Sequence, residues 1–214
     1  MSKPGPMGNV RRQAISKKTQ RAAGRPPFRT WQIVYSLYCP PGGFVVDPTC
    51  GGNIRGIVAE DMGLRYLGID ISERVLSNTP RKGVEYVQAD CMAYPFPACD
   101  LVCSSLPYGR LERYGGGEKD LSEMKYEDYI ETVCRLVDKS LEAAPFVAFE
   151  VGSYREGKKY RPIAADVMSR RANVLYDEMI IVRNSSLTAI MGAKNWERNR
   201  KLVRCHSTVM VFAR

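Results

Sequence analysis

Short apolar runs and segments of helical periodicity alternate along this chain from residue 28 onward. The apolar runs predict strands because turn residues bound them, among them Pro-Pro-Gly-Gly at 40–43 and Pro-Phe-Pro at 95–97. Strands are predicted at residues 44–47, 65–71, 84–89, 101–104, 146–151, 174–182 and 208–212. Strands that alternate with helices indicate an α/β protein with a mostly parallel sheet.

Three segments between these strands carry the helical spacing. The longest predicted helix is amphipathic and covers 126–143, and shorter ones are predicted at 54–62 and 161–171. No helical pattern separates the last two strands, so we expect them to pair antiparallel. The predicted fold is therefore Rossmann-like, a seven-stranded, mostly parallel sheet with an antiparallel C-terminal hairpin strand. In such sheets ligands bind at the carboxyl ends of the strands.

Composition changes this picture little. Hydrophobic residues make up 44% of the 214 residues and charged residues 26%, which is ordinary for a globular protein. No apolar run approaches the roughly 20 residues of a membrane span, and the polar N-terminus lacks the apolar core of a signal peptide. We therefore expect a cytoplasmic protein without a membrane partner. The seven cysteines show no C-x-x-C spacing and His206 is the only histidine, so no metal site is expected.

The net charge of +9 is concentrated near the N-terminus. No acidic residue precedes Asp47, and the basic residues before it are Lys3, Arg11, Arg12, Lys17, Lys18, Arg21, Arg25 and Arg29. Residues 1–27 carry few large apolar side chains, so they are predicted to be a basic, disordered tail. The tail is interpreted either as a solubilising segment or as one that follows a phosphate backbone.

The first candidate site follows the first predicted strand directly. It consists of Asp47, Pro48, Cys50, Gly51 and Gly52, just before a predicted helix. Glycines allow a close approach of the backbone to a ligand, and a helix N-terminus offers free N–H groups to an anionic group. Neither G-x-G-x-x-G nor a P-loop sequence is present. A tight turn explains these glycines equally well when they are considered alone.

Two further carboxylates strengthen the case for a ligand. Asp70, followed by Ile71, ends the second strand, where an acid commonly accepts hydrogen bonds from ribose hydroxyls. Asp90 ends the third strand and is placed to meet an adenine edge. Each acid is equally explained as a helix cap or loop carboxylate. Three acids at three successive strand ends favour an adenosine-containing ligand.

A second motif ends the fourth strand, and it carries a family resemblance. Ser105, Leu106, Pro107 and Tyr108 resemble the [D/N/S]-P-P-[Y/F] motif of amino-methyltransferases that modify exocyclic nitrogens of DNA bases. Residues 47–52 resemble the cofactor motif of the same family, D-P-F-x-G-x-G. Matches at 39–43, 160–162 and 201–212 extend the similarity to small phage-type DNA methylases over about residues 28–214.

This resemblance implies an activity and a set of roles. The fold would be that of S-adenosylmethionine (SAM)-dependent methyltransferases, with residues 28–214 as the catalytic domain and SAM as cofactor. Ser105 and the carbonyl of Leu106 would accept hydrogen bonds from the target amino group, and Tyr108 would stack on a base taken out of the duplex. The acceptor would be adenine N6 or cytosine N4. Leu106 departs from the family, which has proline there, so a catalytically degenerate relative remains an alternative.

A basic stretch between the last two strands is the predicted nucleic-acid contact. Its candidate residues are Lys194, Trp196, Arg198, Arg200, Lys201 and Arg204. Long loops of this kind are usually functional or disordered, and a solvated charged loop is the other interpretation. No large recognition domain is visible, so specificity is expected from these loops, from a homodimer or from a partner protein.

Three other functions stay open at this stage. Residues 107–110 also resemble the P-P-Y-G-x-R of enzymes that methylate guanine N2 in tRNA, which makes RNA an alternative to DNA. A nucleic-acid-binding protein without catalysis would keep the basic segments. A methyltransferase acting on a small molecule or a protein would not need them. The resemblance favours a DNA methyltransferase working in a bacterial or phage-infected cell.

Overall fold

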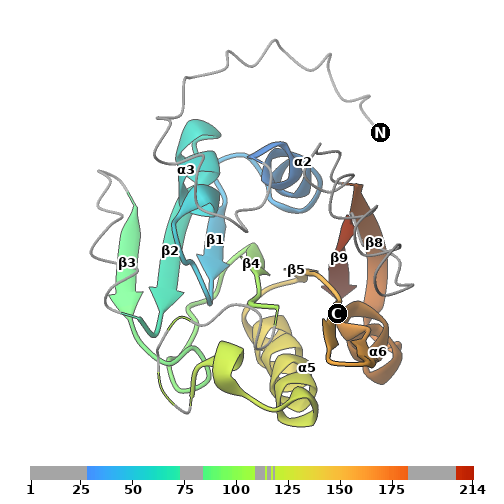
Figure 1. The fold of residues 1–214 in the computed structure, drawn as a ribbon. Helices are drawn as coiled ribbons and strands as arrows, with labels where there is room; N and C mark the ends of the chain where they lie inside the picture. The colour runs from blue at the N-terminus through green and yellow to red at the C-terminus, as the bar shows by residue number, and fades with distance from the viewer. Residues whose placement is uncertain (1–27, 73–83, 109–113, 115–116, 118, 183–205) are drawn as a thin grey trace.

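A seven-stranded sheet forms the centre of the protein (Figure 1). The structure, a computed structural model, describes residues 28–72, 84–108, 114, 117, 119–182 and 206–214. The strands of the sheet are β1 (Phe44–Asp47), β2 (Arg65–Asp70), β3 (Glu85–Gln88), β4 (Leu101–Ser105), β5 (Phe146–Val151), β8 (Leu175–Val182) and β9 (His206–Ala213). Their order across the sheet is β3-β2-β1-β4-β5-β9-β8.

Strand directions agree with the prediction from the sequence. β1, β2, β3, β4 and β5 pair parallel, whereas β9 runs antiparallel to both β5 and β8. The order of the strands in the sheet reverses between β1 and β4, so the connections that follow these two strands lie on opposite faces of the sheet. Parallel sheets bind ligands in the crevice that opens at such a reversal, beyond the carboxyl ends of the strands.

Helices cover both faces of the sheet. In Figure 1, α2 (Phe28–Tyr38) and α3 (Ile54–Asp61) lie on one face, and α5 (Tyr126–Ala143) and α6 (Ile163–Arg170) lie on the other. A short 3-10 helix, η2 (Leu121–Glu123), precedes α5. The alternation of side chains along a strand builds the two layers, because Val45 packs with α2 and α3 whereas Val46 packs with α5.

Besides the short η2, two features of the fold were not predicted. The first is α2, whose Trp31, Val34 and Tyr35 are fully buried against the sheet. An isolated helix of 11 residues is marginal in water, so this packing stabilises α2 more than its own sequence does. The second is a two-stranded sheet formed by β6 (Tyr154–Glu156) and β7 (Lys159–Arg161) between β5 and α6. Three-residue polar strands carry too short a pattern to be recognised.

The predicted basic tail at 1–27 and the predicted nucleic-acid contacts between 194 and 204 lie outside the described residues. Among the described residues, no helix is long and apolar enough to cross a membrane.

Helix α5 is the main support of one core layer, and this can be tested. Leu136 is fully buried on α5. We expect Leu136→Ala to lower the free energy of unfolding by about 2–5 kcal/mol, because it removes buried methyl groups and leaves a cavity. Urea-induced unfolding measures this loss. The exposed neighbour Arg135 is the control, and Arg135→Ala should change the free energy by less than about 0.5 kcal/mol. Equal losses in both variants would contradict the assigned packing of α5.

Candidate functional site

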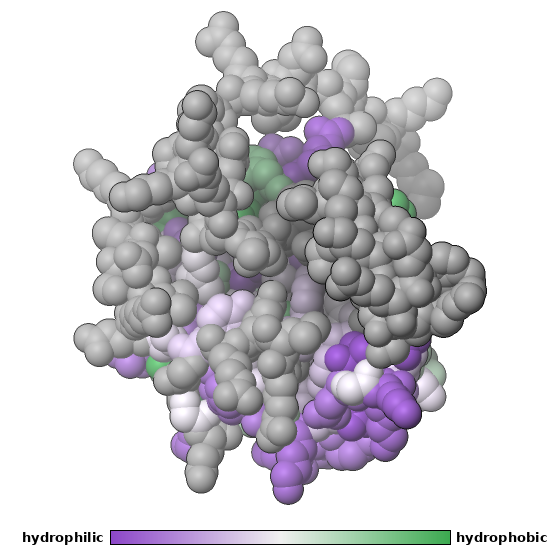
Figure 2. All heavy atoms as spheres, in the orientation of Figure 1, coloured by the Kyte–Doolittle hydropathy of each residue, from purple (hydrophilic) through white to green (hydrophobic). Residues whose placement is uncertain are grey.

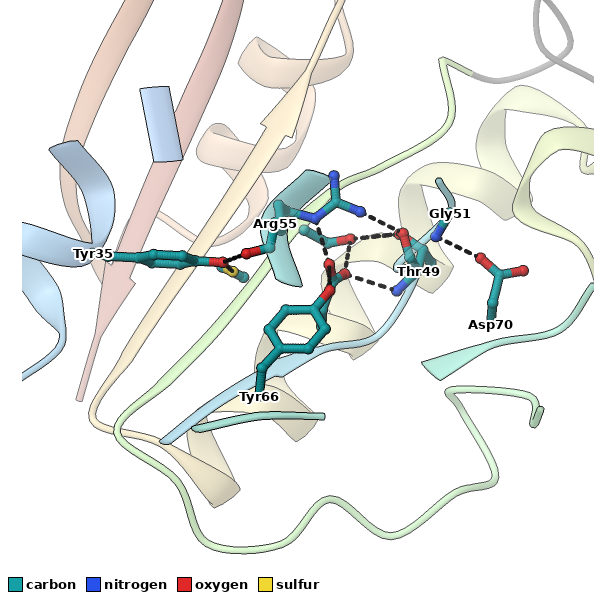
Figure 3. A network of polar contacts seen from close by, with 9 residues as sticks. Tyr35, Thr49, Gly51, Arg55, Tyr66 and Asp70 are labelled. Atoms are coloured by element: carbon teal, nitrogen blue, oxygen red, sulfur yellow. Dashed lines mark hydrogen bonds and ion pairs between the residues drawn. The ribbon is translucent and has the colours of Figure 1, made fainter. Parts of the chain in front are cut away.

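A buried carboxylate at the end of β1 organises the first half of the site. Figure 3 shows the polar network around it, with Thr49, Arg55 and Tyr66 labelled. Asp47 is 0% exposed, and its two oxygens accept four hydrogen bonds within the protein. Oδ1 accepts from the Thr49 main-chain N–H at 3.2 Å and from Ser104 Oγ at 2.7 Å. Oδ2 accepts from the Tyr66 hydroxyl at 2.6 Å and from Arg55 Nε. The Asp47 side chain therefore shapes the turn, and its direct contact with a ligand stays a prediction from the sequence.

Arg55 is the cationic partner of this carboxylate and is itself buried, on α3. Its Nη2 donates to the Thr49 carbonyl at 2.7 Å, and its guanidinium lies 5.4 Å from the centroid of the Trp31 ring. Burial is the largest single influence on the pKa of Arg55 and lowers it, but the charge of Asp47, the hydrogen bond to Asp47 and the nearby Tyr66 together outweigh burial, so the net shift of the pKa is upward. The pair thus holds the main chain at Thr49 with both charges paired inside the protein.

The turn after β1 depends on an unusual backbone. Gly51 has φ +53° and Asn53, which precedes α3, has φ +62°. Cys50 is buried against β2, and a Cβ at Gly68 would lie 2.9 Å from the Cys50 Cβ. Glycine at 68 is therefore what lets this turn approach β2 closely. Pro48 is also buried, whereas Thr49, Gly51 and Gly52 are the half-exposed residues of the turn.

Asp70 and Asp90 lie at the ends of neighbouring parallel strands. Asp70 accepts from the main-chain N–H groups of Gly51 and Ser72, both at 2.9 Å. Burial raises the pKa of the Asp70 carboxyl, while these two hydrogen bonds act against the shift. Asp90 Oδ1 accepts from the Met92 N–H at 2.9 Å. Both acids thus stabilise the turns they begin, as the alternative interpretation expected, and Asp70 also joins β2 to the glycine turn. Ile71 follows Asp70 and is half-buried.

A lysine on α5 fixes the loop that follows Asp90. Lys139 Nζ donates to three carbonyl oxygens, those of Cys91 at 2.8 Å, Met92 at 2.9 Å and Tyr94 at 2.7 Å. Its ammonium also lies 4.5 Å from the centroid of the Phe96 ring. A lysine on an amphipathic helix is ordinarily a solvent-facing residue, so no sequence pattern predicted this contact.

The second half of the site is the turn at the end of β4. Ser105 is half-buried and pairs in register with Glu150 of β5. The Leu106 main-chain N–H donates to the Glu150 carbonyl at 2.9 Å, and the Leu106 side chain is 1% exposed. The Tyr129 hydroxyl, from α5, donates to the Pro107 carbonyl at 2.8 Å. Proline at 106 would restrict φ but would have no N–H to donate. Leucine lacks that restriction, and its hydrogen bond and buried side chain hold the turn instead.

The ring of Tyr108 packs on the backbone just after β5. A Cβ at Gly152 would lie 3.0 Å from Cε2 of Tyr108 and 3.2 Å from two more ring atoms. Glycine at 152 thus makes room for the aromatic ring. The tyrosine side chain is half-buried at the carboxyl end of the sheet.

A direct side-chain contact joins the two halves of the site. Thr49 Oγ1 and Ser104 Oγ lie 2.5 Å apart, and Ser104 Oγ also donates to Asp47. Because the single Ser104 proton is directed at Asp47, the Thr49 hydroxyl is the donor in the shorter contact. The residue before Ser105 is therefore fixed to the turn that follows β1.

The predicted site residues within the described part of the chain come together at one edge of the sheet. This holds for residues 47–52, Asp70, Ile71 and Asp90 and for residues 105–108, which follow β1 to β4. The residues around them that sequence reasoning missed are Thr49, Arg55, Tyr66, Ser104, Tyr129, Lys139, Glu150 and Gly152. Arg55, a charged residue inside an otherwise apolar helical turn, was the one detectable signal. Among the described residues, no cluster of His, Cys, Asp and Glu fit for a metal ion occurs.

Several solved structures with the same fold are named as methyltransferases or methylases. A TehB-like SAM-dependent methyltransferase from Corynebacterium glutamicum has a TM-score of 0.56 at 16% identity, over 92% of this chain and 93% of that one. A SAM-dependent methyltransferase from Archaeoglobus fulgidus has a TM-score of 0.55 at 14% identity, over 88% and 95%. An rRNA methylase from Streptococcus thermophilus has a TM-score of 0.53 at 10% identity, over 90% and 99%.

No protein-family model and no curated protein matches the sequence. At the identities of the solved structures the similarity shows the fold. The chain has the Rossmann-like fold of SAM-dependent methyltransferases, as the sequence predicted.

The buried pair of Asp47 and Arg55 generates the next prediction. We expect Asp47→Asn to lower the free energy of unfolding by about 3–5 kcal/mol, because it leaves the Arg55 guanidinium buried without its counter-charge. Urea-induced unfolding measures the effect. In a double-mutant cycle, Arg55→Met should cost less in the Asp47→Asn background than in the wild type. Additive losses would contradict the pairing.

Proposed function

We propose that this protein is a SAM-dependent methyltransferase that modifies an exocyclic amino group of a DNA base, adenine N6 or cytosine N4. The observation that carries the proposal is the link between the two motifs. The turn with the resemblance to a catalytic motif, residues 105–108, is joined through Ser104 and Thr49 to the turn with the resemblance to a cofactor motif. Direct methyl transfer requires the donor and the acceptor base to be held next to each other, as two adjoining binding turns would hold them.

The residues of the first turn fit SAM by their chemistry. The half-exposed main chain at Gly51 and Gly52 leads into the N-terminus of α3, which suits the anionic carboxylate of the methionine part. Asp70 at the end of β2 suits the ribose hydroxyls, and Asp90 with the loop fixed by Lys139 suits the adenine edge. When bound, SAM supplies an electrophilic methyl group on a sulfonium.

The residues of the second turn would prepare the acceptor. The lone pair of a base amino group is delocalised into the ring, so the nitrogen is a poor nucleophile until its two N–H bonds are directed. In this proposal Ser105 Oγ and the Leu106 carbonyl accept those bonds, and Tyr108 stacks on the base. The Leu106 hydrogen bond to Glu150 supports an intact turn despite the missing proline, and so favours catalysis over a degenerate site.

DNA is preferred to RNA because the resemblance to small phage-type DNA methylases covers most of the chain. RNA remains the second candidate, since residues 107–110 also resemble a tRNA methyltransferase motif and several proteins with this fold are named RNA or rRNA methylases. A homodimer or a partner protein that contributes to sequence recognition belongs to the same proposal.

Mass spectrometry of nucleosides tests the activity. Duplex DNA incubated with the protein and SAM should yield N6-methyldeoxyadenosine or N4-methyldeoxycytidine. We expect Tyr108→Ala to lower kcat/KM by about 5- to 150-fold, which corresponds to the loss of one stacked base. Arg135→Ala, on the exposed face of α5, is the control and should retain activity. Methylation of tRNA or rRNA with unmodified DNA would sink the DNA assignment and favour the RNA candidate.

Cofactor binding has its own test. We expect Asp70→Asn to weaken SAM binding by about 10- to 100-fold, because a neutral amide makes weaker hydrogen bonds to hydroxyls than a carboxylate does. Isothermal titration calorimetry with SAM alone measures the change without requiring turnover. Asp61→Asn, at the exposed end of α3, is the matched control and should bind like the wild type. The absence of SAM binding by the wild-type protein would refute the proposed function at its first step.

A further inference from the structure

The hairpin of β6 and β7 has no role in the site described so far. Its strands pair antiparallel, with Arg155 opposite Tyr160 and Glu156 opposite Lys159. Gly157, with φ +58°, forms the turn together with Lys158. The hairpin begins three residues after the end of β5, so it leaves the sheet at the same edge as the candidate site.

Charge on this hairpin is strongly one-sided. Arg155, Lys158 and Lys159 are exposed, and among the described residues none of them forms an ion pair with a carboxylate. The acidic residue of the hairpin, Glu156, is bound by Arg161 through a contact of 2.6 Å. Three exposed cations thus lie within five residues of chain, and none of them has an ion-pair partner among the described residues.

An aromatic ring accompanies these cations. Tyr160 is 45% exposed, and the Arg155 guanidinium lies 5.6 Å from the centroid of its ring. Arg155 Nη1 also donates to the Lys158 carbonyl at 3.5 Å, so the ring and the turn hold the guanidinium in place while its other N–H groups remain available to an anion. Hydrophilic side chains gather over this part of the surface, around α6, in Figure 2. Cations interleaved with an exposed ring are typical of nucleic-acid contacts.

The base of the hairpin is fixed to the first turn of α5. Tyr154 is buried, and its ring centroid lies 6.4 Å from that of Tyr126. Arg161 lies on β7, the other strand of the hairpin, and its guanidinium is 4.4 Å from the centroid of the same Tyr126 ring. The Tyr126 hydroxyl in turn donates to Asp166 Oδ2 of α6 at 2.5 Å. The exposed cations are therefore carried on a base that both helices hold.

The same elements hold the candidate catalytic turn. Tyr129, three residues after Tyr126 on α5, donates to the Pro107 carbonyl. Gly152, two residues before the hairpin, supports the Tyr108 ring. The hairpin is thus connected to residues 105–108 through α5 and through the end of β5.

We propose that the β6–β7 hairpin binds the phosphate backbone of duplex DNA next to the target base, with Arg155, Lys158 and Lys159 as the phosphate contacts. This inference rests on the proposed function, and it adds a contact surface distinct from the basic stretch of residues 194–204. A base presented to residues 105–108 brings its flanking phosphates to this edge of the sheet. Phosphate contacts position a duplex without reading its sequence.

Salt dependence of DNA binding tests the hairpin. We expect the double variant Lys158→Gln, Lys159→Gln to reduce the slope of log K against log salt concentration by about 2, since each lost phosphate contact contributes about 0.9. Fluorescence anisotropy with a labelled duplex oligonucleotide measures this slope. The control removes two charges elsewhere, by Arg65→Gln at the amino end of β2 and Arg135→Gln on α5, and should keep the wild-type slope.

Several outcomes separate this inference from the proposed function. Circular dichroism and SAM calorimetry should give wild-type results for the hairpin variant, and its KM for DNA should rise more than its kcat falls. If the salt-dependence slope of the hairpin variant equals that of the control variant, the hairpin contact is overturned, even if methylation of DNA is observed. A slope change seen with RNA duplexes alone would overturn the assignment to DNA. A reduced slope with DNA in a protein that transfers no methyl group would support the hairpin contact and refute the proposed function.

Discussion

The buried ion pair between Asp47 and Arg55 is the interaction on which the site depends. A carboxylate without solvent contact is costly unless each lone pair has a donor, and Asp47 meets this requirement with donors from its own turn and from α3, β2 and β4. The donors come from four separate stretches of chain, so the pair can form only when all of them are in place. The end of β1, the start of α3 and the end of β4 are therefore fixed by one cluster.

This cluster joins the two motifs into one candidate site. The glycine turn after β1 takes its shape from Arg55, which holds the Thr49 carbonyl, and from Asp70, which holds the Gly51 N–H. The Thr49 hydroxyl then contacts Ser104, the residue before the candidate catalytic turn. The two turns are thus fixed relative to one another, which suits a reaction governed by the alignment of two bound groups.

Helix α5 holds the opposite side of the site in the same manner. Tyr129 fixes the carbonyl of Pro107, Lys139 fixes the loop after Asp90, and Tyr126 carries the base of the β6–β7 hairpin. One face of α5 buries apolar residues against the sheet, while Tyr126, Tyr129 and Lys139 of the same helix make these three further contacts. The helix therefore links the proposed adenine loop, the catalytic turn and the proposed DNA contact to a single rigid element. Placing binding groups on a packed helix gives more precise positions than a loop alone provides.

The sequence by itself determined the order of the elements, the class of the fold and the strand ends at which the motifs lie. It did so because the spacing of apolar residues and the positions of glycine and proline act on local structure. The predicted helix at 126–143 and the predicted strand at 146–151 have the same bounds in the structure. Only the tertiary structure decided which polar groups are partners. Asp47 was predicted to contact a ligand, and in the structure donors from the protein itself surround it. Leu106 departs from the family motif, and only the structure shows that its N–H donates to the Glu150 carbonyl. Such choices depend on residues tens of positions apart that folding brings within hydrogen-bond distance, and no local pattern records them.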